Sequence, residues 1–354
     1  MKKGFLMLIG AMMISAVGAQ QLTEGEMALV YFTPKNNVLL DFDYTVDVYE
    51  AGIYHKYAEE MLGISEAISE TRTEYQLTKV KIGRNTLADS NRPHKVVPDK
   101  VFPAQLLSID SRGLLMGYNL PIEKEKEEQH KPKADRPKQK SADDAFQFLP
   151  LTDEQLEIRG EEARAKAVAK QIYRIRETRM FILGGEVENP PADGQAMRLV
   201  LKELDEQEKE LVALFIGRHS SHKEHKQIVH QPIENAAEER FCLYFSDENG
   251  FTSPENIDAD SIIVTLKVNR QSAQPAVVSK KQDKNAPVPS QLVYNLPGSV
   301  DITVVYKEAT LAEKNIPVAQ YGIDVPLSRE LFTGDKLPVI RFDTRTGNIR
   351  SIQQ

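Results

Sequence analysis

Two apolar stripes at helical spacing, within residues 152–216, constrain the fold of this chain more than any other feature. The first stripe consists of Ala165, Val168, Ile172, Ile175 and Ile182, and the second of Met197, Val200, Leu204, Leu211 and Phe215. Gly184 and Gly185 end the first segment, and Asp193 is placed to cap the second. Because apolar residues recur every three or four positions, both segments are predicted to be amphipathic helices. The short connection between them predicts an antiparallel helical hairpin.

Alternating patterns on either side of these helices indicate β-strands. Residues 38–49 place Phe42 and Tyr44 on one face and aspartates on the other. Glycine-containing turns at 110–113 and 343–347 indicate two β-hairpins. We therefore expect an α+β fold in which two β-rich lobes are joined by the antiparallel helical hairpin.

The expected layout has five parts. They are a signal peptide at 1–19, an N-terminal β-rich lobe with one short helix at 20–120, a charged disordered linker at 121–147, the helical hairpin at 148–217 and a C-terminal β-rich lobe at 218–354. The linker assignment rests on residues 121–145, which carry seven acidic and seven basic residues. Within them, residues 131–140 form a basic stretch that is either part of a solvated linker or a patch for an anionic partner.

The N-terminus has the three parts of a secretory signal peptide. Lys2 and Lys3 precede an apolar stretch at 5–17, and small residues lead to a cleavage site between Ala19 and Gln20. No cysteine lies near this site, so no lipid anchor is expected, and no apolar run reaches the ~18 residues of a membrane span. We expect a mature protein that is periplasmic or extracellular.

Three histidines after the second helix are a candidate metal site. His219, His222 and His225 have side chains that bind zinc or copper. Their spacing fits poorly, because on a strand His222 points away from the other two. The alternative interpretation is a polar segment that leaves the helical hairpin.

Three arginines on the first helix are a candidate ligand-binding site. Arg174, Arg176 and Arg179 lie within two turns and are suited to clamping a carboxylate or another anion. The alternative interpretation is that they pair with the acidic second helix.

The sequence shows no nucleophile motif, phosphate-binding loop or dinucleotide fingerprint, so no cofactor is expected. The formal net charge of -7 disfavours a nucleic-acid partner. We expect a non-enzymatic envelope or extracellular protein that binds a protein or glycan partner or acts as a scaffold. The alternative is a secreted hydrolase or a carbohydrate-active accessory protein, whose carboxylates come together only in the fold.

Several segments resemble an uncharacterised family of exported, Bacteroidetes-type proteins, a domain-of-unknown-function family. The segments that carry the resemblance are 28–32, 54–63, 169–179, 185–186, 191–194 and 340–352. The most specific of them is Tyr173 to Arg179. The charged residues 123–144 and the histidines from 219 to 230 depart from the family's pattern. The resemblance implies export and the domain layout, and it implies no activity.

Overall fold

The computed structural model describes residues 28–97, 106–120, 160–186, 193–270, 291–334 and 336–353. The expected signal peptide, with its cleavage site, and the expected linker lie outside the described residues. Within the described ranges, no helix combines the length and the apolar character needed to cross a membrane.

The longest strands belong to a three-stranded antiparallel sheet in which the first strand is central. Its strands are β1 (Leu29–Glu50), β2 (Arg72–Val96) and β5 (Arg218–His230). The alternation in β1 buries Leu40 and Phe42 completely, while Asp41 and Asp43 lie on the opposite face. β5 follows the helices in the sequence but pairs along β1.

A five-stranded sheet packs on the buried face of the first sheet. Its strands are β6 (Glu238–Ser246), β7 (Gly250–Thr252), β8 (Asp260–Asn269), β9 (Val293–Tyr306) and β10 (Ala309–Pro326), in the order β10-β9-β8-β6-β7. The rings of Tyr44 and Phe245 meet edge to face, with their centroids 5.9 Å apart. The two sheets therefore form a sandwich around the main apolar core.

A small four-stranded sheet is built from the two predicted hairpins, which the structure confirms. Its strands are β3 (Leu107–Ile109), β4 (Leu115–Tyr118), β11 (Val339–Phe342) and β12 (Ile349–Gln353). The two turns are alike, because Asp110 accepts the N–H of Arg112 and Asp343 accepts the N–H of Arg345, each at 2.9 Å. β4 and β11 pair in the middle, so the hairpins are the halves of one sheet. One more short helix, η3 (Arg329–Phe332), precedes β11.

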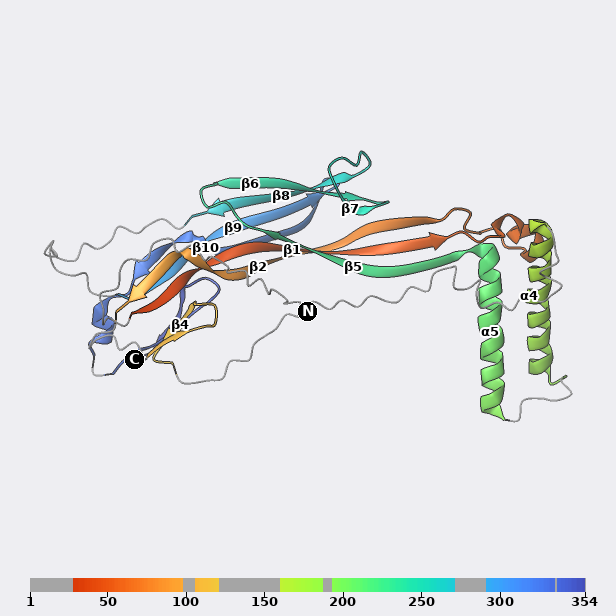
Figure 1. Cartoon of the computed structure of the whole chain (residues 1–354), viewed down its shortest axis with the longest axis horizontal. Helices are drawn as coiled ribbons and strands as arrows, with labels where there is room; N and C mark the ends of the chain where they lie inside the picture. The colour runs from red at the N-terminus through yellow and green to blue at the C-terminus, as the bar shows by residue number, and fades with distance from the viewer. Residues whose placement is uncertain are drawn as a thin grey trace, which may run out of the picture.

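The remaining helices lie at the far end of the three-stranded sheet. They are η1 (His55–Tyr57), α1 (Ala58–Leu62), α4 (Glu161–Gly184) and α5 (Gly194–Ile216). The sheet continues past the sandwich as a narrow ribbon, and α4 and α5 project sideways from its end (Figure 1). We call residues 47–50, 72–74 and 218–221 the stalk, and α4 with α5 the helical pair.

The expectation of an α+β fold, with two β-rich lobes joined by a helical hairpin, is wrong, because the chain is mainly β. The main core combines Val38 from before the helices with Val300 from after them. A second core does the same with Tyr31 and Ile340. The strands on both sides of the helices thus share one body, and the helical pair stands at the end of a sheet. Alternation indicates strands but does not say which strands pair, so it could not show that the two expected lobes are one.

Candidate functional site on the helical pair

The junction between the stalk and the helical pair depends on two glycines. α5 passes into β5 through Gly217, whose φ is 81°, and a Cβ there would lie 2.3 Å from the carbonyl oxygen of Glu50. At Gly52 a Cβ would lie 2.7 Å from the carbonyl oxygen of Leu214. The N–H of Tyr54 donates to that same oxygen at 2.8 Å. These close backbone approaches fix the end of α5 to the stalk.

Near the stalk, the helices share a small apolar core with η1 and α1. Ile172 of α4 and Phe215 of α5 are fully buried in it, and the ring centroid of Tyr54 lies 5.4 Å from that of Phe215. The hydroxyl of Tyr173 on α4 donates to the carbonyl oxygen of Met61 on α1, at 2.9 Å. The short helices therefore cover one face of the helical pair at this end.

Ion pairs join α4 to α5 beyond this core. Arg176 Nε donates to Glu208 Oε1 at 2.6 Å, and Arg179 Nη2 lies 2.7 Å from Glu208 Oε2. Arg179 also pairs with Asp205, and that hydrogen bond raises the pKa of the guanidinium. Arg174, the third arginine of the predicted site, is exposed. Two of the three arginines are therefore engaged by carboxylates of the second helix, and anion binding by the set remains a prediction.

The far end of the helical pair carries large apolar side chains that are open to solvent. We call Met180, Phe181, Leu183, Leu199 and Val200 the apolar tip. Met180 is 73% exposed, and Leu183 and Leu199 are each 67% exposed. Both helices contribute to the tip, which lies at the end away from the stalk (Figure 1). Several large, exposed apolar side chains at one end of a helical pair are typical of an interaction surface.

The three predicted metal ligands do not converge. His219 and His225 lie on the outer face of β5, where His219 Nε2 is 3.2 Å from Asp47 Oδ1 and His225 Nδ1 is 3.0 Å from Asp43 Oδ1. His222 faces the other way, as alternation along a strand requires. In the described part of the chain, no group of three or more His, Cys, Asp or Glu side chains is placed to hold a metal ion.

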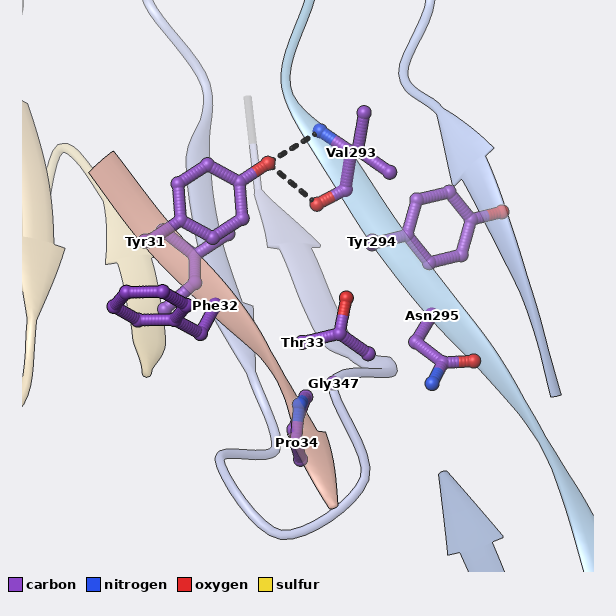
Figure 2. A pocket seen from close by; sticks show the side chains of 9 residues that line it. Tyr31, Phe32, Thr33, Pro34, Val293, Tyr294, Asn295 and Gly347 are labelled. Carbon is purple, nitrogen blue, oxygen red and sulfur yellow. Dashed lines mark hydrogen bonds between the residues drawn. The ribbon is translucent and has the colours of Figure 1, made fainter. Parts of the chain in front are cut away.

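We call the body that the three sheets form together the β-body. A small cavity lies inside it, between the beginnings of β1 and β9 (Figure 2). Tyr31 closes one side, because its hydroxyl donates to the carbonyl oxygen of Val293 at 2.8 Å and accepts the N–H of Val293 at 2.7 Å. Burial raises the pKa of the Tyr31 phenol. The cavity measures about 10 Å³, which is room for about one water molecule. Its lining residues include no carboxylate and no histidine.

A family model described as a domain of unknown function, DUF4831, matches residues 27–350. The chain belongs to this family. The DUF4831 match runs across the sandwich, the stalk and the helical pair, and it confirms the resemblance to an uncharacterised family. The comparisons with curated proteins and with solved structures find no match.

In this DUF4831 protein, the feature that sequence reasoning missed is the apolar tip. Residues 180–183 are four consecutive apolar residues, which is more than a one-sided stripe needs. These four consecutive apolar residues are the one feature of the sequence that indicates exposed apolar side chains at this end of the helix. The predicted stripes include Ile182 and Val200 as positions that face the other helix, and they leave out Met180, Leu183 and Leu199.

Proposed function

We propose that this protein is exported and acts without catalysis, as an envelope or extracellular scaffold whose helical pair binds a protein partner. The observation that carries the proposal is the exposed apolar tip at the end of the stalk. Leaving such side chains in water forfeits about 1.5–3 kcal/mol for each one that a partner could cover completely. Docking of a partner recovers part of this free energy.

The β-body supports this assignment, because it places the helical pair away from the bulk of the molecule. In the stalk, Tyr49 of β1 stacks on His219 of β5, with the ring centroids 4.5 Å apart. The guanidinium of Arg72 on β2 lies over the same tyrosine ring, 4.3 Å from its centroid. Contacts that cross all three strands stiffen the stalk. A stiff spacer that carries an apolar tip suits a scaffold better than a catalyst.

The alternative function, a secreted hydrolase or carbohydrate-active accessory protein, requires acidic groups that converge in a pocket. The pairs of Asp47 with His219 and of Asp43 with His225 lie on an open sheet face. The cavity beside Tyr31 has no acidic lining residue. In the described residues, these groups give the alternative no support.

Export is the part of the proposal that rests on sequence alone. The basic start, the apolar stretch and the small residues before Gln20 are the support for it. N-terminal sequencing of the protein from the periplasm or the medium should begin at Gln20. A secreted chain that begins at Met1 would contradict cleavage.

Site-specific crosslinking tests the role of the helical pair. A photoreactive amino acid replaces Leu199 of the apolar tip in one variant, and in the control it replaces Ile257, which is 97% exposed in the loop before β8. The proposal predicts covalent protein adducts in the cell from position 199 and few or none from position 257. Equal yields at the two positions, or no adduct at position 199, would contradict it.

A further inference from the structure

We infer that Met180 makes the apolar tip sensitive to oxidation, so that peroxide turns off partner binding by converting this side chain to its sulfoxide. The inference rests on the proposed function and adds the regulation of that same site. It requires only that the tip binds its partner through apolar contacts.

Met180 is the most exposed member of the apolar tip, at 73%. The other four members are hydrocarbon side chains, namely Phe181, Leu183, Leu199 and Val200. The thioether of Met180 is therefore the one oxidisable sulfur in the tip. An oxygen atom added at this sulfur places a polar group on a surface that is otherwise apolar.

Solvent exposure separates Met180 from the other methionines in the described part of the chain. Met61, Met116 and Met197 are only partly exposed. Because access to the oxidant governs how fast a side chain is oxidised, Met180 should react first. Cys242 is a second exposed sulfur, but it lies on β6 of the β-body, whereas Met180 lies on α4 (Figure 1). The two sulfurs can therefore be tested separately.

The chemistry needs one oxidant and one later reductant. Hydrogen peroxide transfers one oxygen atom to the thioether sulfur, so that the O–O bond breaks, the S=O bond of the sulfoxide forms and water leaves. A methionine sulfoxide reductase reverses this step with two thiols, which are oxidised to a disulfide while the oxygen leaves as water. Because both directions are available, oxidation can switch binding off and reduction can restore it.

The sulfoxide opposes docking because its oxygen accepts hydrogen bonds from water. An apolar partner surface that covers the tip removes this water and offers no donor in its place. Burial of a polar group without a hydrogen bond is costly, so we expect the affinity for the partner to fall at least ~10-fold. The helical pair itself should stay folded, because Met180 does not belong to the core that α4 and α5 share with η1 and α1.

Peptide mass spectrometry tests the selectivity of the reaction on the purified chain from Gln20 onward, in a Cys242→Ser background. In dilute hydrogen peroxide, Met180 should become the sulfoxide several-fold faster than Met61, Met116 or Met197. The circular dichroism spectrum should not change, whereas retention on a phenyl column should fall. Met180→Leu keeps an apolar side chain without the sulfur, so its retention should survive the same treatment.

Crosslinking in cells tests the effect on binding. The photoreactive amino acid again replaces Leu199, and the cells receive a brief exposure to hydrogen peroxide before illumination. The yield of adducts should fall several-fold for the Cys242→Ser protein and should stay unchanged when the same protein also carries Met180→Leu. Met180→Gln, which has a polar side chain of similar length, should lose the adducts without any peroxide.

Three results overturn the inference and leave the proposed function intact. The first is a Met180 that oxidises no faster than the partly exposed methionines. The second is a yield of adducts that survives both peroxide and Met180→Gln. The third is an equal loss of adducts in the Met180→Leu protein, which would place the sensitive group elsewhere. Untreated cells that give no adduct from position 199 would remove the proposed function and the inference together.

Discussion

Arg179 of α4 and Glu208 of α5 form an ion pair across the helical pair, with Nη2 and Oε2 2.7 Å apart. Glu208 also accepts a hydrogen bond from Arg176, so one carboxylate holds two arginines of the opposite helix. Its side chain is 14% exposed, compared with 28% for that of Arg179. Glu208 is therefore the central member of the link between the helices.

Replacement of Glu208 by Gln should loosen this link. We expect the free energy of unfolding to fall by about 0.5–1.5 kcal/mol, because the pairs are partly exposed and solvent screens them. Urea denaturation followed by circular dichroism measures the change. Glu203→Gln, on the exposed side of the same helix, should cost less than about 0.5 kcal/mol. Equal effects of the two variants would show that the ion pairs contribute nothing.

Gly52 should tolerate no side chain. Gly52→Ala places a Cβ 2.7 Å from the carbonyl oxygen of Leu214, so either the end of α5 or the stalk must shift. We expect a loss of about 1–3 kcal/mol and faster hydrogen exchange in the last turns of α5.

Gly194 provides the matched control for that substitution. It begins α5, and, its chain neighbours and own helix backbone aside, no atom of the described residues lies within 4 Å of the position that a Cβ would take there. Gly194→Ala should therefore be neutral or should stabilise the protein by up to about 1 kcal/mol. If Gly52→Ala leaves both stability and exchange unchanged, the close junction between helix and stalk is incorrect.

Asp324 should make the β-body sensitive to acid. Burial acts to raise the pKa of this carboxyl group, but hydrogen bonds from His94 and Arg92 outweigh burial and hold the pKa below its ordinary value of 3.8. The group then binds protons more weakly in the folded state than in the unfolded state. Its contribution to stability is present above the ordinary pKa and is lost as pH falls through the lower, folded value.

The measurement is the free energy of unfolding against pH for the wild type and for Asp324→Asn. The variant should be less stable by about 1 kcal/mol at pH 6, because Arg92 loses its charged partner. The difference should shrink below pH 4, where the wild-type carboxylate becomes protonated. Two curves that stay parallel from pH 6 to pH 3 would contradict this assignment.

Removal of the hydroxyl of Tyr31 should weaken the joint between β1 and β9. Tyr31→Phe leaves the N–H and the carbonyl of Val293 without the partner that both share, and we expect a loss of about 1–3 kcal/mol. Tyr294 extends from the same strand away from Tyr31, so Tyr294→Phe serves as the control with a small effect (Figure 2). Thermal unfolding compares the two variants, and equal melting temperatures would show that the bridge is unimportant.

Local elements of this fold follow from local sequence, and long-range pairing does not. Asp193 caps α5 through hydrogen bonds from Gln195 and Ala196, as its position before an apolar stripe predicts. Glu50 and Arg218, in contrast, are opposite each other in the sheet although they are 168 positions apart. Alternating residues on β1 and β5 are compatible with many partners, so no local pattern could assign this pair.

In the candidate site, too, some features follow from the local sequence and others depend on distant parts of the chain. The arginines of α4 stand out in the sequence by their charge, and the structure shows that acidic residues of the neighbouring helix engage Arg176 and Arg179. The exposure of Leu183 could not be derived in the same way. A stripe position is buried or open according to how far the neighbouring elements extend, and α1 ends before it reaches the tip.

Oxidative footprinting of Met180 tests the central claim, that the end of the helical pair is a contact surface, most directly. Met180 is 73% exposed in the single chain and should oxidise rapidly in dilute solution, whereas Met116 in β4 is the internal reference. In intact cells, the oxidation of Met180 relative to Met116 should fall several-fold, because a partner covers the tip. The same ratio in cells as in dilute solution would mean that the apolar tip stays uncovered where the protein works, and the claim would be contradicted.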